Sequence, residues 1–107
     1  MDQLNNILLE GIVVKEPVAL TEKSTVFSIE NTYDNKMFSI DVFCYNKLGE
    51  KCLKTISEGM SVRVVGRLRQ MTLENVLKEV VTSIVIVAEH IEYRKQNCFA
   101  TKCNSVL

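Results

Sequence analysis

The sequence predicts an all-β domain with one short helix, built as a five-stranded Greek-key barrel with the helix between the third and fourth strands. Three observations support this fold class. Apolar and polar residues alternate over residues 37–45, which is typical of a half-buried strand. The period changes to about 3.6 residues over residues 48–56, as in an amphipathic helix. Strand alternation then returns over residues 62–69.

The first three strands follow from alternation and turn residues. The first strand is expected over residues 7–14, with a bend at Gly11, and Pro17 is expected to close it because proline cannot continue a central ladder. Residues 21–25 form a polar turn into a second strand over residues 26–33. Residues 34–36 form a tight turn into the third strand, and the two strands make a hairpin.

The helix and the fourth strand follow the third strand. The helix is expected to pack inward through Leu48, Cys52, Leu53 and Ile56. Gly59 is expected to end the helix in a left-handed conformation. In the fourth strand the inward positions are expected to be Val62, Val64, Gly66 and Leu68.

The last part of the barrel is less regular. Residues 70–78 are interpreted as either a short hairpin loop or one helical turn, with Asn75 as the turn residue. Residues 79–93 form the last strand, whose near-continuous Val, Thr and Ile run predicts burial on both faces. Residues 1–93 therefore form one domain, and residues 94–107 form a loosely ordered tail. This order of elements is that of the OB-fold, which binds oligonucleotides and oligosaccharides.

Composition narrows the function classes. The 107 residues carry 13 basic and 13 acidic side chains, so any nucleic-acid site must come from local charge arrangement. No signal peptide or membrane-spanning stretch is apparent, and we expect a cytoplasmic protein with reduced cysteines. Cys98 and Cys103 are spaced too loosely for a zinc pair, and no metal or other cofactor is expected. His90 is the only histidine and belongs to no catalytic motif, so we expect no enzyme activity.

Four segments resemble, in order and spacing, the motifs of bacterial single-stranded DNA-binding proteins. Residues 4–11 (LNNILLEG) are similar to an opening N-x-V-x-L-x-G strand, and Glu16-Pro17 stands at the position of a D-P pair. Residues 42–50 resemble V-x-[FW]-[GN]-K-x-A-E, and residues 58–68 resemble K-G-x-x-V-x-V-x-G-x-L. The resemblance implies a homo-oligomer, a dimer or tetramer, that coats single-stranded DNA without sequence preference in replication, recombination or repair.

The chain also departs from that family. It has no Trp, and Ser39 and Leu73 fall where the family carries stacking aromatics. Asp41 stands where a basic residue is usual, the hairpin after residue 68 looks short, and the tail has no acidic tip. These departures favour an alternative, in which the barrel is a protein-interaction or primosome subunit with weak DNA binding. A barrel that binds RNA would use the same base stacking and phosphate contacts, and it is a further alternative.

The candidate DNA-binding residues are aromatic platforms and cations on the outward face of the third and fourth strands. Tyr45 matches a family stacking position, Phe43 lies two residues before it, and Tyr33 lies close to another. The expected phosphate-binding residues are Arg63, Arg67, Arg69, Lys15 and Lys36. The three arginines alternate along one strand and share a face. The alternative roles are a contact between copies for the aromatics, and ion pairs with Asp41 and Glu30 for the arginines.

Overall fold

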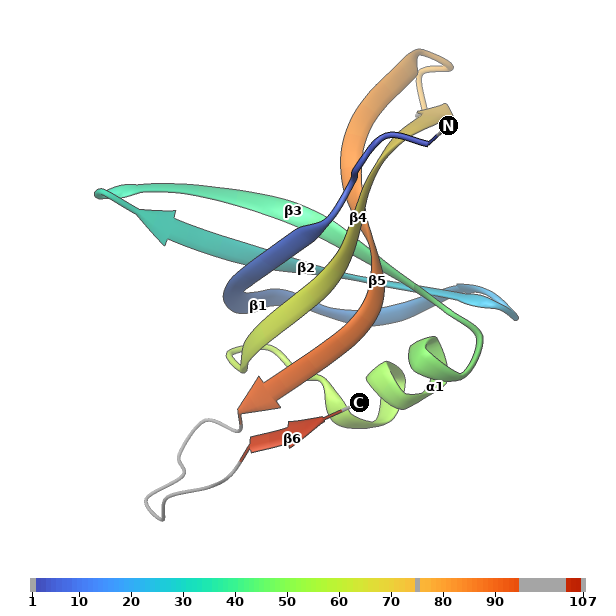
Figure 1. Ribbon diagram of the computed structural model, residues 1–107. Helices are drawn as coiled ribbons and strands as arrows, with labels where there is room; N and C mark the ends of the chain where they lie inside the picture. Colours follow the sequence, from blue (N-terminus) through green and yellow to red (C-terminus); the bar gives the residue numbers. More distant parts are fainter. Residues whose placement is uncertain (1, 75, 95–103, 107) are drawn as a thin grey trace.

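The computed structural model describes residues 2–74, 76–94 and 104–106 (Figure 1). The elements in order are β1 (Ile7–Thr21), β2 (Ser24–Tyr33), β3 (Lys36–Tyr45), α1 (Asn46–Thr55), β4 (Ser61–Glu74), β5 (Val80–Arg94) and β6 (Asn104–Val106). The strands follow the order β3-β2-β1-β4-β5-β6. A parallel pairing of Val42 with Ile86 and Phe43 with Val87 joins β3 to β5 and closes the first five strands into a barrel. The predicted OB-fold, with its helix between β3 and β4, is confirmed.

Apolar side chains from the five barrel strands and α1 fill the interior. Alternate residues of a strand point to opposite faces, so each barrel strand contributes every second residue to this core. Its buried members are Val13, Phe27, Ile29, Val42, Cys44, Cys52, Ile56, Met60, Val62, Val64, Ile86, Ala88, Ile91 and Tyr93. The core lies where β1–β5 enclose it, so the outer faces of these strands remain for binding.

β1 continues through Pro17 to Thr21, so the expected end of the strand at residue 14 is wrong. Beyond Ile12 the strand pairs only with β2, and its register shifts between Val13 and Lys15 and again before Val18. A proline is tolerated at such a bulge or strand edge because its missing N–H leaves no ladder bond unmade. The 15-residue strand therefore bends around the barrel.

The turn between β2 and β3 has the conformation that its sequence predicts. Asp34 and Asn35 have φ angles of 53° and 60°, and Tyr33 pairs with Lys36 on either side of them. Two successive left-handed residues match the right-handed twist of the strands, which is why Asp and Asn suit this turn. The β2–β3 hairpin extends well beyond the barrel (Figure 1).

α1 is shorter than expected and buries a narrower face. It ends at Thr55, before Gly59, and its buried residues are Gly49 and Cys52. Leu53 is 44% exposed, so its expected inward position is wrong. Gly59 does have a positive φ of 92°, but it serves the turn into β4, where its N–H donates to the Val13 carbonyl across 2.8 Å.

The β4–β5 hairpin is longer than the sequence indicates. β4 reaches Glu74 and β5 starts at Val80, so residues 70–74 are strand and the expected hairpin loop is confined to the end of the stretch, where residues 76–78 form a turn. Asn75 lies outside the described residues. Leu68 lies on the same face as its cross-strand partner Ile86, as expected, but it is 40% exposed. Ile84 is 52% exposed, which contradicts the expected two-sided burial of the last strand. The reason is that both strands project beyond the barrel, where no second layer covers them (Figure 1).

A sixth strand, which the sequence did not predict, lies in the expected tail. β6 pairs antiparallel with the end of β5, with Val106 opposite Glu92. Residues 95–103 lie outside the described residues, so the expected division into a domain and a tail stays a prediction. Within the described part of the chain, no helix has the length and apolar character needed to cross a membrane.

Candidate nucleic-acid interface

The two candidate tyrosines lie at opposite ends of the β2–β3 hairpin. Tyr33 is 82% exposed and lies beside the turn, where it pairs with Lys36. Tyr45 is half-buried, ends β3, and pairs with Ser24. β3 has 10 residues, and a strand rises by about 3.3 Å per residue, so about 30 Å of strand separates the two positions. The unbroken register places Tyr33, with Lys36, on the opposite face of the hairpin from Tyr45. They cannot stack on one base, and a bound polynucleotide must follow the hairpin and also pass over its edge to contact both.

Phe43 is not exposed, which contradicts its expected role as a base platform. Its side chain is 6% exposed, and its cross-strand partners are Val26 on β2 and Val87 on β5. Alternation correctly places Phe43 on the opposite face of β3 from Val42 and Cys44. It does not reveal that strands flank β3 on both sides at this position. Phe43 therefore packs at the seam that closes the barrel, and its ring has no face open to a base.

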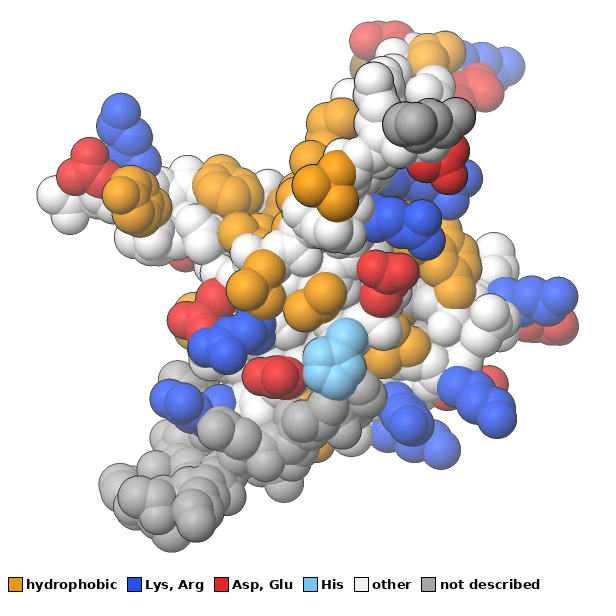
Figure 2. All heavy atoms as spheres, viewed as in Figure 1, with side chains coloured by type: hydrophobic (Ala, Val, Ile, Leu, Met, Phe, Trp, Pro, Cys, Tyr) orange, Lys and Arg blue, Asp and Glu red, His pale blue; other side chains and the backbone are white. Residues whose placement is uncertain are grey.

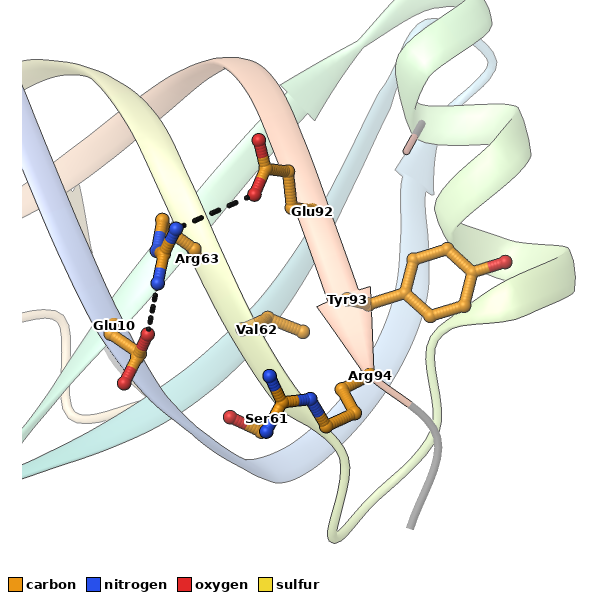
Figure 3. A pocket seen from close by; sticks show the side chains of 7 residues that line it. All are labelled: Glu10, Ser61, Val62, Arg63, Glu92, Tyr93 and Arg94. Carbon is orange, nitrogen blue, oxygen red and sulfur yellow. Dashed lines mark hydrogen bonds and ion pairs between the residues drawn. The ribbon is translucent and has the colours of Figure 1, made fainter. Parts of the chain in front are cut away.

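The three candidate arginines are exposed at alternate positions of β4, but their ion pairs differ. Arg63 contacts two carboxylates, with Nη2 at 3.0 Å from Glu10 Oε2 and Nη1 at 3.6 Å from Glu92 Oε2 (Figure 3). Arg67 Nη2 lies 3.6 Å from Glu89 Oε2. Within residues 2–74, 76–94 and 104–106, Arg69 has no ion pair.

The ion pairs reflect strand neighbours that sequence spacing does not reveal. The expected partners Asp41 and Glu30 do not pair with the arginines; the carboxylates come from β1 and β5, on either side of β4. Asp41 instead accepts a hydrogen bond from the Ser28 hydroxyl. Exposed ion pairs contribute about 0–1 kcal/mol each, so a phosphate can displace them at low cost. Arg63, with two acidic neighbours, is the least suited of the three to bind phosphate.

The surroundings of Arg63 form a hollow of about 270 Å³ (Figure 3). It is lined by Glu10, Ser61, Val62, Arg63, Glu92, Tyr93 and Arg94. His90 Nε2 is 3.8 Å from Glu92 Oε1, at the same carboxylate. Two carboxylates oppose the approach of a phosphate here. The hollow is therefore a poor path for a nucleic-acid backbone, despite its two arginines.

The N-terminal segment lies against β4 next to Arg67 and Arg69. Asn5 Nδ2 donates to the Leu68 carbonyl across 2.9 Å, and the Leu68 N–H donates to Asn5 Oδ1 across 3.0 Å. The side-chain amide thereby imitates a strand partner before β1 begins. Asn5, Arg67, Leu68, Arg69 and Val87 line a hollow of about 290 Å³. Sequence analysis missed Asn5 because an Asn before a strand gives no sign of its distant partner.

The two candidate lysines lie in different settings. Lys36 is exposed beside Tyr33 at the tip of the β2–β3 hairpin. Lys15 is exposed on β1 and lines a hollow of about 180 Å³ together with Ser28, Ser39, Asp41 and Ser83. Because Asp41 shares that hollow, its carboxylate offsets the charge of Lys15. Lys36 is the better placed of the two to contact a phosphate next to a stacked base.

Acidic, basic and apolar groups are interspersed on the face formed by β1, β4 and β5 (Figure 2). Leu8 and Val65 are cross-strand partners on this face, 69% and 36% exposed, and Val65 lies between Arg63 and Arg67 along β4. Among the residues that the structure describes, no three His, Cys, Asp or Glu side chains gather as a metal site would require. The chemistry available at this face is charge pairing and apolar contact.

Comparison with known proteins identifies a family whose model matches this chain and a solved structure with a similar fold. The family model of the single-strand binding protein family matches residues 4–94. A solved structure described as a Plasmodium falciparum SSB complex with ssDNA superposes with a TM-score of 0.67, covering 83% of this chain and 90% of that chain at 19% sequence identity. At this identity the superposition shows a shared fold. A comparison with curated proteins gave no match.

Proposed function

The chain belongs to the single-strand binding protein family, and from this premise we propose that it coats single-stranded DNA without sequence preference during replication, recombination or repair. The observation that carries the proposal is the family match, which spans β1 to β5 and therefore the whole barrel. The same match does not favour the alternative of a primosome or interaction subunit. Stacking and charge pairing involve no catalytic step, so no enzyme activity is assigned.

The proposed contacts lie on the β2–β3 and β4–β5 hairpins. Tyr33 and Tyr45 stack bases along β2–β3, and Lys36 binds a phosphate beside Tyr33. Arg69 and Arg67 bind phosphates on β4, where Asn5 fixes the neighbouring N-terminal segment. Arg63 and Lys15 contribute less because carboxylates share their surroundings. None of these contacts reads a base edge, which accounts for binding without sequence preference.

The proposed site supports modest affinity. Each stacked base contributes about 1–3 kcal/mol, and of the candidate platforms Tyr33 is exposed, Tyr45 is half-buried and Phe43 is buried. Three cations with few acidic competitors, Lys36, Arg67 and Arg69, would neutralise about three phosphates, which predicts a slope of about −2 for log affinity against log salt concentration. The net charge of zero adds no general attraction.

The proposed assembly is a homo-oligomer, a dimer or tetramer, that works in the cytoplasm. Support comes from the exposed apolar side chains on the outer sheet, among them Leu8 at 69% and Ile12 at 45%. Side chains of this kind are stabilised when a second copy covers them. Analytical ultracentrifugation of the purified chain measures this assembly directly, and a monomer at all concentrations would contradict it.

Intrinsic tyrosine fluorescence during an oligo-dT titration tests the DNA contacts, because the chain has no Trp. Stacking on Tyr45 should quench the signal, and Tyr45→Ala should remove most of that change, while Tyr33→Ala removes a smaller part. The buried Tyr93 serves as the internal reference, since it is 9% exposed. The Arg63→Ala/Arg67→Ala/Arg69→Ala variant should bind weakly. A matched control is Lys51→Ala/Lys54→Ala on α1, and full-strength binding by the arginine variant would refute the assignment.

A further inference from the structure

The barrel core contains two thiols that touch. Cys44 lies near the end of β3 and Cys52 lies in α1, and both side chains are 0% exposed. Their sulfurs are 3.7 Å apart, with Cys52 Sγ donating a hydrogen bond to Cys44 Sγ. Neither is bonded to another cysteine. DNA binding as proposed above does not use either thiol, so their contact requires a separate explanation.

We infer that Cys44 and Cys52 form a redox modification site, at which a hydroperoxide converts the buried thiol pair into an intramolecular disulfide linking α1 to β3. A disulfide needs its sulfurs at about 2.05 Å, so the pair must close by about 1.7 Å. The two residues are eight positions apart and lie on elements that pack together, so a small shift of α1 toward β3 is sufficient. The barrel ladders need not open.

The two thiols have different roles in this reaction. When Cys52 has lost its proton, the Cys44 thiol can turn and donate to the thiolate, and this hydrogen bond lowers the pKa of Cys52. The same hydrogen bond, with burial, raises the pKa of Cys44. Since the thiolate is the nucleophile, Cys52 is the attacking residue and Cys44 is the resolving residue.

The reaction balances with hydrogen peroxide as the oxidant. The Cys52 thiolate attacks one peroxide oxygen, the O–O bond breaks, and Cys52 sulfenic acid forms with release of hydroxide, which takes up the proton that Cys52 lost. The Cys44 sulfur then attacks the Cys52 sulfur, the S–O bond breaks, and the Cys44 proton leaves with the hydroxyl as water. The net change is two thiols and one peroxide to one disulfide and two waters.

Access to the buried pair comes from the weak start of α1. The helix has 10 residues, its N-cap Tyr45 makes no side-chain cap hydrogen bond, and no acidic residue lies in the first turn. A helix of this length depends on packing for stability, so it can open locally while the barrel stays folded. A small oxidant such as peroxide needs only a brief opening of this kind.

Peptide mapping of the unsubstituted protein tests the inference, because trypsin places each cysteine in its own peptide. Cys44 falls in residues 37–47, Cys52 in 52–54, Cys98 in 96–102 and Cys103 in 103–107. After peroxide treatment of the native protein we expect a linked 37–47/52–54 pair, lower in mass by two hydrogen atoms and released by dithiothreitol. No such pair, or a link from Cys44 or Cys52 to Cys98 or Cys103, would overturn the inference.

Two single variants test the order of attack. In Cys44→Ser the resolving sulfur is absent while a hydroxyl can still donate to the Cys52 thiolate, so dimedone should label Cys52 as a trapped sulfenic acid. In Cys52→Ala the attacking thiol is absent, so Cys44 should stay unlabelled; labelling of Cys44 instead would reverse the roles. Should either variant fail to fold, the map of the unsubstituted protein still decides the inference, and neither result depends on DNA binding.

Discussion

Gly66 lies against the backbone of β5, and Gly66→Ala should destabilise the protein strongly. A Cβ at this position would lie 2.1 Å from the Val87 carbonyl oxygen and 3.0 Å from Ala88 Cα, whereas ordinary contacts begin at 3.4 Å. The obstacle is backbone, and the register of the two strands already shifts between Val65 and Gly66. No rotamer change can relieve the overlap, so the strand pair must separate locally.

The loss of unfolding free energy caused by Gly66→Ala can be estimated from substitutions that overpack the cores of other proteins. Inserted methyl groups cost about 1–3 kcal/mol even where side chains can move, and here a 1.3 Å overlap (3.4 Å less 2.1 Å) falls on backbone, so we expect about 3 kcal/mol. At about 5 °C per kcal/mol for a domain of this size, Tm should fall by about 15 °C. The same substitution should also redirect the hairpin that carries Arg67 and Arg69.

Urea and thermal unfolding followed by circular dichroism measure this loss. Gly49→Ala is the comparison variant: its Cβ would meet the Thr25 Oγ1 atom at 2.9 Å and the Cys44 carbonyl oxygen at 3.0 Å, a much smaller overlap than at Gly66, and the helical position favours alanine by about 1 kcal/mol. We expect that variant to unfold within about 1 kcal/mol of the parent chain. A Gly66→Ala protein as stable as Gly49→Ala would refute the steric argument.

Three further substitutions test the site. Arg69→Ala should make the slope of log affinity against log salt shallower by about 0.7. Arg63→Ala should change that slope less, because Glu10 and Glu92 already neutralise its side chain. A larger change for Arg63→Ala than for Arg69→Ala would show that the ion pairs do not matter. Asn5→Ala should cost about 1 kcal/mol and speed hydrogen exchange at the Leu68 amide, while Asn5→Asp, which keeps the acceptor, should slow that exchange again. Phe43→Leu should lower stability by about 1 kcal/mol and leave oligo-dT quenching unchanged, and a loss of quenching would mean that the ring contacts bases after all.

Local patterns predicted most of the barrel. The alternation around Val42 and Val64 and the Asp34–Asn35 turn are decided within a few residues, so the sequence is sufficient for them. The errors come from long-range geometry. Pro17 is tolerated because β1 has lost one neighbour there, and Leu68 is exposed because its hairpin leaves the barrel. Neither fact is visible in the residues near the position concerned.

The candidate site was predicted less completely than the fold. The positions of Tyr33 and Lys36 beside a turn, and the shared face of the arginines, follow from strand period and turn length. The carboxylates beside Arg63 come from β1 and β5, and the Asn5 contact with Leu68 joins residues 63 positions apart. Such contacts depend on strand order and register, which a single sequence does not specify at residue level.

The length of β3 sets a minimum length for an oligonucleotide that contacts both tyrosines of the β2–β3 hairpin. Because about 30 Å of strand separates Tyr33 from Tyr45 and the two side chains lie on opposite faces, an oligonucleotide too short to pass over the hairpin edge gains from one tyrosine at a time. Once the strand is long enough, the second ring is presented at a high effective concentration, and its stacking adds to the first without a second encounter. Affinity should therefore rise in a step as oligo-dT is lengthened, rather than in proportion to the number of bases.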